Sequence, residues 1–275
     1  MPGRGYDHHR DDEHDHEHNV ASVIVDRRGR PVLDGDLVPD SRSRAGADSG
    51  AQLLVAASLL ILAGLAWAWT AAMAAMPECH RLGLPSFVLM WTVMMAAMMF
   101  PAVVPVVLAF TALARARRGS PTLAAAAFVA GYLVVWGALG VPAEALLAGA
   151  ARLAAALPAL ARLGGPVLVL CGVYQLTPFK DACLRHCRLP LLFLGHHWRD
   201  GLGGALLLGA HHGLYCAGCC AALMVVLLVV GVMNVGWMVA LSALIYLEKV
   251  LPAGGLVGRL AGLGLCAAGA ARMLG

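Results

Sequence analysis

The sequence predicts an all-α protein. The expected fold is a polytopic membrane helix bundle of about seven transmembrane helices, with a disordered tail rich in His, Asp and Glu before it. Hydrophobic residues make up 60% of the 275 residues and charged residues only 13%, outside the range of soluble globular domains. Most acidic residues and a cluster of histidines lie before residue 50. We therefore expect two regions, a cytoplasmic tail over residues 1–50 and a transmembrane domain over residues 51–275.

Seven apolar runs are candidates for membrane spans. They cover residues 51–74, 86–112, 121–150, 163–178, 201–230, 232–249 and 255–273. The fourth and sixth runs are short, so six spans with a re-entrant segment are the alternative. If the N-terminus is cytoplasmic, eleven Lys and Arg residues flank the spans on the inner side and four on the outer side. The positive-inside rule therefore predicts a multi-pass protein with a cytoplasmic N-terminus.

Two histidines and three cysteines interrupt the fifth apolar run, in GAHHGLYCAGCCAALMVV at residues 209–226. An α-helix turns about 100° per residue, so residues three and four apart share a face. Measured from Cys216, the directions of the other three side chains lie within about 60°. The four predicted ligands on this stripe are His212, Cys216, Cys219 and Cys220.

Small residues accompany this stripe. Gly209 and Gly213 lie on the same side of the helix, so we expect a second helix to approach closely there. His211 points about 100° away from His212 and is expected to be inert. The polar side chains of the stripe should therefore face another helix and not lipid.

Thiolate and imidazole groups on one face can surround a Cu(I) or Zn²⁺ ion. Packing is an alternative, because a buried cysteine often behaves as a small hydrophobic residue. A dithiol redox role is a second alternative. The C-x2-CC spacing with a histidine four residues upstream favours a metal site over both.

The second apolar run contains MWTVMMAAMMFP at residues 90–101. Met90, Met94 and Met98 recur at intervals of four and would line one helix face. Thioethers favour Cu(I) over harder ions, so these residues are predicted to line a metal path. Packing is the alternative, because methionine fills irregular cores.

A third candidate lies in LTPFKDACLRHCRLP, residues 176–190, on the predicted cytoplasmic side. Cys183 and Cys187 are four residues apart, so one helical turn would bring their thiols together. In a reducing compartment such a pair binds metal or takes part in redox chemistry more often than it forms a permanent disulfide. We predict an inner metal site here, and two ordinary thiols are the alternative.

The tail supplies the fourth candidate, DHHRDDEHDHEH at residues 7–18. Its histidines are interspersed with carboxylates, and such tracts commonly bind divalent transition metals. The predicted buffering ligands are His8, His9, His14, His16 and His18. A solvated tail without metal is the alternative.

Few other ionisable residues fall within the apolar runs. Glu144 lies inside the third run, and intramembrane charge indicates function by default. Glu248 and Lys249 are expected to form a pair at a helix end near the interface. Motifs of nucleotide hydrolases and serine or zinc hydrolases are lacking, so binding is favoured over catalysis. The arginines lie in loops, and a nucleic-acid partner is not expected.

Several segments together resemble the predicted metal-binding integral membrane proteins of bacteria, a family long carried as a domain of unknown function. The resemblance rests on WTVMMAAMMFP (91–101), GYLVVW (131–136), YQLTPFKDACLRHCRLP (174–190), GLYCAGCC (213–220), GVMN (231–234) and the pair Glu248–Lys249. These segments occur in order over residues 90–250. The resemblance implies a bacterial inner (plasma) membrane protein with metal ligands.

The sequence therefore predicts a membrane protein that binds a soft metal, copper first and zinc second, and handles, delivers or transports it. Expected partners are the lipid bilayer, the metal ion and a metalloenzyme or metallochaperone. One alternative is a membrane thiol–disulfide oxidoreductase, which would use Cys183–Cys187 because adjacent cysteines form a strained disulfide. The other is a non-catalytic assembly factor for a respiratory metalloenzyme.

Deleting residues 1–20 should lower the number of bound divalent ions and leave the bundle folded. A segment with so few apolar residues contributes almost nothing to packing. Element analysis and thermal unfolding of the detergent-purified protein measure the two effects. A lower melting temperature after the deletion, without added metal, would contradict a purely buffering tail.

Overall fold

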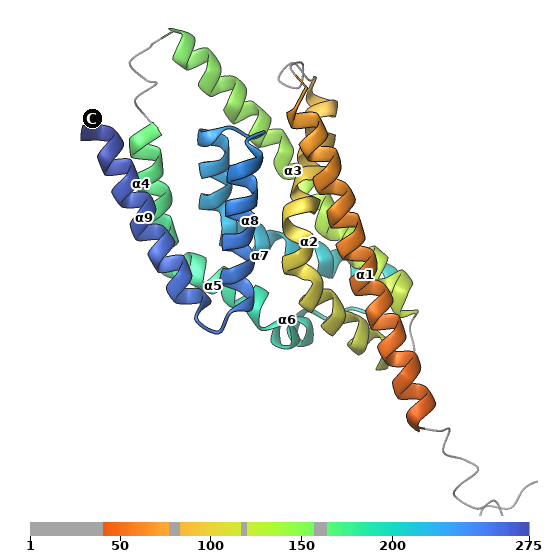
Figure 1. The fold of residues 1–275 in the computed structure, drawn as a ribbon. Coiled ribbons are helices and arrows are strands. Elements are labelled where there is room, and N and C mark those ends of the chain that lie inside the picture. Colours follow the sequence, from red (N-terminus) through yellow and green to blue (C-terminus); the bar gives the residue numbers. More distant parts are fainter. Residues whose placement is uncertain (1–40, 77–82, 117–119, 157–163, 275) are drawn as a thin grey trace, which may run out of the picture. The chain divides into compact units, whose positions relative to one another are not determined.

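The computed structural model describes residues 41–76, 83–116, 120–156 and 164–274. These residues are almost entirely helical and contain no strand, which confirms the all-α prediction. In chain order the helices are α1 (Ser41–Ala74), α2 (Leu84–Ala116), α3 (Pro121–Ala156), α4 (Gly164–Gln175), α5 (Pro178–Arg188), α6 (Pro190–His197), α7 (Gly201–Val230), α8 (Val235–Val250) and α9 (Gly254–Leu274) (Figure 1). Residues 49–275 form one compact unit, which contains the helices that build the site.

Five helices in the described part of the chain are long and apolar enough to cross a membrane. They are Gly50–Ala74, Leu84–Arg115, Pro121–Ala156, Gly201–Val230 and Gly254–Leu274. A sixth span results if α4 and α5 are counted together, although the chain bends by 59° between them. Helix α8 has only 16 residues, whereas a bilayer core requires about 20. The described residues thus support five or six membrane-length helices, which agrees with the six-span alternative and leaves the count of seven a prediction.

The bend between α4 and α5 follows from a local capping sequence. The Thr177 hydroxyl accepts a hydrogen bond from the Lys180 N–H at 3.4 Å and caps the new helix. Pro178 follows in the first turn of α5, where the N–H that it lacks would have no helical partner. The predicted span over residues 163–178 therefore ends at Gln175, and the chain continues in a new direction.

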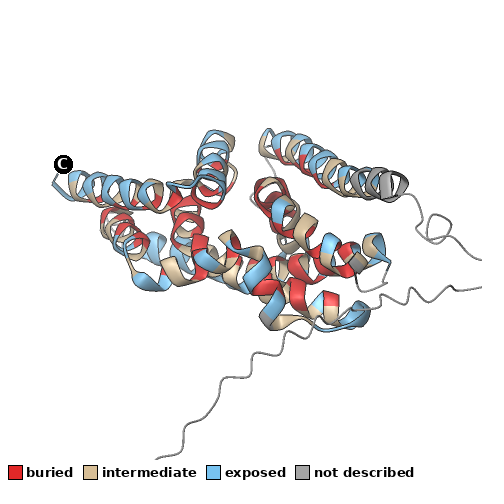
Figure 2. Ribbon diagram, turned by 90° about the horizontal axis from the view of Figure 1, so that it is seen from below, coloured by how far each residue is buried: buried red, intermediate tan, exposed pale blue. Residues whose placement is uncertain are grey.

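Large apolar side chains cover the outward faces of the helices. Leu53, Leu170 and Leu191 are 71%, 67% and 71% exposed. Buried residues gather on the inward faces (Figure 2). Soluble monomers seldom expose apolar surface on this scale. The pattern is compatible with a membrane protein.

Helices α3 and α7 pack closely because glycines lie at their contact. A Cβ on Gly209 would overlap the Phe128 carbonyl oxygen, and one on Gly213 would lie 3.1 Å from the Val135 Cβ. Gly131 faces the backbone of α7 in the same way, since a Cβ there would overlap the Leu206 carbonyl oxygen. The close approach of a second helix that Gly209 and Gly213 predicted is confirmed.

Glycines also join α4 to α9, which lie side by side (Figure 1). A Cβ on Gly262 would lie 2.9 Å from the Gly172 carbonyl oxygen. One on Gly269 would lie 2.6 Å from the Gly165 carbonyl oxygen. Small residues at such contacts allow backbones to approach within van der Waals distance. The close packing against α9 therefore holds α4 in place before the bend.

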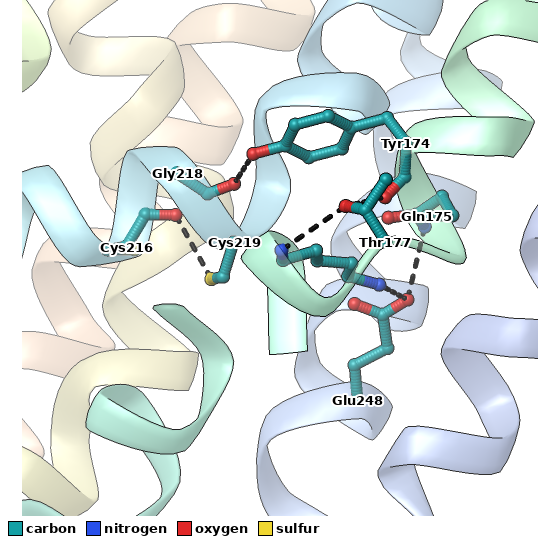
Figure 3. Close-up of polar contacts among 8 residues, drawn as sticks. Tyr174, Gln175, Thr177, Cys216, Gly218, Cys219 and Glu248 are labelled. Atoms are coloured by element: carbon teal, nitrogen blue, oxygen red, sulfur yellow. Dashed lines mark hydrogen bonds and ion pairs between the residues drawn. The ribbon is translucent and has the colours of Figure 1, made fainter. Parts of the chain in front are cut away.

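A buried ion pair fixes α5 against α8. The Lys180 ammonium lies 2.8 Å from Glu248 Oε1, and both side chains are at most 2% exposed. The Gln175 amide donates to the same oxygen at 3.3 Å (Figure 3). On α9, Gly258 leaves room for the pair, since a Cβ there would lie 2.8 Å from Lys180 Nζ.

The variant Lys180→Met should lose about 3–5 kcal/mol of unfolding free energy, because it leaves the Glu248 carboxylate buried without its partner. The double variant Lys180→Met/Glu248→Met should lose much less, since it removes both charges. Thermal and denaturant unfolding of the detergent-purified proteins measure the difference. A single variant as stable as wild type would show that the pair does not hold α5 in place.

Candidate metal site

The inward face of α5 is set by helical spacing. Lys180, Cys183, Leu184 and Cys187 follow the i, i+3, i+4, i+7 pattern, and all four are buried. The Cys183 thiol packs against α7 at Gly218, where a Cβ would lie 2.8 Å from its sulfur. One turn later, Cys187 Sγ lies 3.9 Å from Cys219 Sγ on α7. The two cysteines predicted as a separate inner site therefore pack against the α7 stripe.

The α7 stripe is buried along its whole length. His212, Cys216, Cys219 and Cys220 are each at most 1% exposed. The thiols of Cys219 and Cys220 donate to the Cys216 carbonyl oxygen at 3.1 and 2.9 Å. The Tyr174 hydroxyl donates to the Gly218 carbonyl at 2.7 Å and ties the end of α4 to the same turn of α7 (Figure 3).

The Cys216 thiol is at the centre of the buried polar groups. It interacts with the side chains of Cys187, Cys219 and Cys220. Lys249 Nζ donates to its sulfur at 2.9 Å, and the Tyr132 hydroxyl lies 3.0 Å from the same atom. An ammonium and a phenol O–H are both suited to stabilise a thiolate, because each can donate to the anion. Helices α3, α5, α7 and α8 all contribute to this cluster.

Glu248 and Lys249 lie at the end of α8, as expected, but they do not pair with each other. Each has a different buried partner: Lys180 for Glu248 and Cys216 for Lys249. Their exposed fractions are 1% and 9%. The sequence signal that could have identified both residues is the cost of placing a charge at membrane depth, which indicates function by default. Tyr132 was missed as well, although it lies in the GYLVVW segment.

His212 is buried among aromatic rings. Its ring centre lies 6.0, 5.9 and 5.5 Å from those of Phe128, Tyr132 and Phe193. Its Nδ1 has no hydrogen-bond partner. Buried polar atoms are nearly always paired, so the unpaired imidazole nitrogen is a donor atom that a ligand could use. His211 is half-buried and faces His197, with ring centres 5.7 Å apart.

The three methionines lie on a buried face of α2. Met94 and Met98 are at most 1% exposed, and Met90 is 3% exposed. Met90 also lines a cavity of about 620 Å³, which is bounded by Glu144, Asn234 and other residues near the start of α2 and the turn between α7 and α8. The methionines therefore belong to the same hydrophobic core as the cysteines and extend from it to this cavity.

The tail histidines, His8, His9, His14, His16 and His18, lie outside the described residues. Within the described residues, no three His, Cys, Asp or Glu side chains surround a common point as a preformed metal site. The donor set still fits a soft metal, since it combines several thiols with a buried imidazole that has an unpaired nitrogen.

Comparison with known proteins finds one family that the chain matches. Residues 88–272 match the family described as PpoB2, copper chaperone. This range includes the methionine face of α2, both cysteine helices and the Glu248–Lys249 pair. No curated protein and no solved structure matches the sequence significantly. Because the match covers more than half of the chain, the protein belongs to the PpoB2 copper chaperone family.

Proposed function

We propose that this protein is a multi-pass membrane protein that holds Cu(I) on a buried thiol cluster and delivers it to a copper-accepting partner. Membership of a copper chaperone family supports copper handling. The observation that carries the assignment of the site is the convergence of α5 and α7, with Cys187 and Cys219 sulfurs 3.9 Å apart next to Cys216. Thiolates select Cu(I) over harder ions, and zinc is the second choice.

The surroundings of Cys216 suit a thiolate that waits for a metal ion. A buried anion is costly unless a cation or strong donors accompany it. Lys249 and Tyr132 supply these at 2.9 and 3.0 Å. We infer that they stabilise the Cys216 thiolate when copper is absent. Copper would then supply the positive charge, and the ammonium would be free to move away.

The remaining thiols need only local movement to join Cys216. Cys219 and Cys220 now donate to the Cys216 carbonyl oxygen. Rotation about χ1 by about 120° would move each sulfur to another staggered position, which is an ordinary side-chain change. His212 lies one turn before Cys216 and has an unpaired nitrogen. It is the imidazole donor of the proposed site.

The other predicted ligands are assigned to the path of the ion. Met90, Met94 and Met98 would pass Cu(I) between the cluster and the cavity of about 620 Å³ that Met90 lines. The five tail histidines would buffer metal at the cytoplasmic face. Cys183 would support the cluster from its position beside Gly218. The expected location is the bacterial inner membrane, with the N-terminus in the cytoplasm.

One competing function has a specific observation in its favour. Cys187 and Cys219 have sulfurs close enough to form a disulfide after a small movement. A thiol–disulfide oxidoreductase would use this pair instead of the Cys183–Cys187 pair that the sequence suggested. An assembly factor for a respiratory metalloenzyme remains the third candidate, and it would bind copper in the same cluster.

Replacing Cys216, Cys219 or Cys220 singly by Ala should weaken Cu(I) binding by about tenfold or more. The double variant Cys216→Ala/Cys220→Ala should lose much less than the sum of the single losses, because the ligands act as one unit. Competition with a colorimetric Cu(I) chelator measures the affinity. Cys171→Ala is the matched control, since Cys171 is a buried thiol on α4 that should leave the affinity unchanged.

The rival functions predict different outcomes of the same experiment. Wild-type copper content in the Cys216/Cys220 double variant would remove the thiol cluster as the copper site. It would leave the oxidoreductase as the better candidate, to be tested by trapping a disulfide between Cys187 and Cys219. Loss of copper in the Cys171 variant as well would indicate general misfolding instead of a lost ligand.

A further inference from the structure

A second group of metal-ligating side chains lies outside the thiol cluster, at a cavity of about 440 Å³ formed by α5 and α6. The lining residues are Arg185, His186, Leu189, Leu192, Phe193 and His197. Two of the six side chains are imidazoles and three are apolar. The proposed function leaves these imidazoles without a role.

Hydrogen bonds fix the tautomers of both imidazoles. His186 Nδ1 lies 2.9 Å from the Ala182 carbonyl oxygen, and His197 Nδ1 lies 3.1 Å from that of Phe193. A carbonyl only accepts, so each Nδ1 carries a proton, and in the neutral imidazole the lone pair is then on Nε2. Metal-ligating histidines in proteins are held in this way, with the second ring nitrogen donating to a carbonyl.

His197 also has a second imidazole within bridging distance. Its ring centre lies 5.7 Å from that of His211 on α7, and the ring planes are inclined by 67°. With metal–nitrogen bonds of about 2.0 Å, two imidazoles on one ion have ring centres about 5 to 6 Å apart. The observed separation therefore fits one shared ion between the two rings.

We infer that His197 and His211 bind a Cu(I) ion beside this cavity, as the site from which the buried thiol cluster is loaded. The inference rests on the proposed copper function and adds the place where the ion is received. It also reverses the expectation that His211 is inert. The His211 ring of α7 lies beside the His197 ring of α6.

Two pairs of adjacent residues each have one member at the proposed receiving site and one at the buried cluster. On α7, His211 faces His197 and the next residue, His212, is buried with an unpaired Nδ1. On α5, His186 lines the cavity and the next residue, Cys187, faces Cys219. Successive helical residues point about 100° apart, so each pair has one donor on the cavity side and one on the buried side.

Aromatic and imidazole rings also lie close together between the proposed receiving site and the buried cluster. Phe193 has its ring centre 5.1 Å from that of His197 and 5.5 Å from that of His212. A single aromatic side chain therefore adjoins both the proposed receiving site and the buried imidazole.

The charge of the cavity favours a monovalent ion. Arg185 lies on its exposed rim, and its guanidinium repels cations in proportion to their charge. The leucines and Phe193 limit hydration, which raises the cost of a divalent ion more than that of a monovalent one. A Cu(I) ion on two neutral imidazoles carries a single positive charge, so both the repulsion by Arg185 and the cost of lost hydration stay small.

The test compares the full-length wild-type protein with His197→Gln, His211→Gln and the double variant, using Cu(I) alone as the probe. Copper stoichiometry is measured against a Cu(I) chelator, and loading of the buried cluster is followed over time. Each variant should lose one copper equivalent and load the cluster about tenfold more slowly or worse. Leu189→Ala is the control, because it changes the cavity wall and no donor.

The outcomes separate this inference from the proposed function. If the variants keep wild-type stoichiometry and loading rate, the receiving site is wrong and the thiol cluster is unaffected. In Cys216→Ala/Cys219→Ala the histidine site should still bind one Cu(I), with a nitrogen-only X-ray absorption signature. If that variant retains all its copper while the histidine variants lose theirs, the histidine site stands and the proposed thiol cluster is wrong.

Discussion

The 59° bend at Thr177–Pro178 is the constraint on which the rest of the site depends. Because the Thr177 cap and Pro178 restart the helix in a new direction, α5 packs against α7 and α8. This single turn brings Cys187 to Cys219 and Lys180 to Glu248.

Two buried cations give the bundle its internal electrostatic order. Lys180 is matched by a carboxylate, and the pair holds α5 in place. Lys249 is matched by a thiol and a phenol, which are weaker partners for an ammonium than a carboxylate is. Adjacent residues on α8 thus have different surroundings: Glu248 belongs to a closed ion pair, and Lys249 to the thiol cluster that we propose as the copper site. This asymmetry is why we assign chemistry to the Cys216 end and stability to the Glu248 end.

Helical periodicity predicted the parts of the site that lie on one helix. The α7 stripe with its glycines, and the pairing of Cys183 with Cys187 on one face of α5, follow from the 3.6-residue turn. Contacts between distant segments carry no such periodic signal. Tyr132 is 84 residues from Cys216 and Lys249 is 33 residues from it, so neither contact was predicted. The sequence left six or seven spans open, and the described residues hold five or six helices of membrane length. An apolar run does not reveal whether a Thr-Pro cap will interrupt it. The neighbour of His211 was not predicted either, because the direction of a side chain on α7 does not reveal that His197 of α6 lies beside it.

Copper K-edge X-ray absorption of the purified, Cu(I)-loaded protein tests the central claim most directly, because it reports the atoms bound to the metal. The donors available in the buried cluster are the thiols of Cys187, Cys216, Cys219 and Cys220 and the imidazole of His212. At one copper per protein, with a chelator present to remove weakly bound metal, we expect two or three sulfur neighbours. A spectrum with only nitrogen and oxygen neighbours under these conditions would contradict the buried thiol cluster as the copper site.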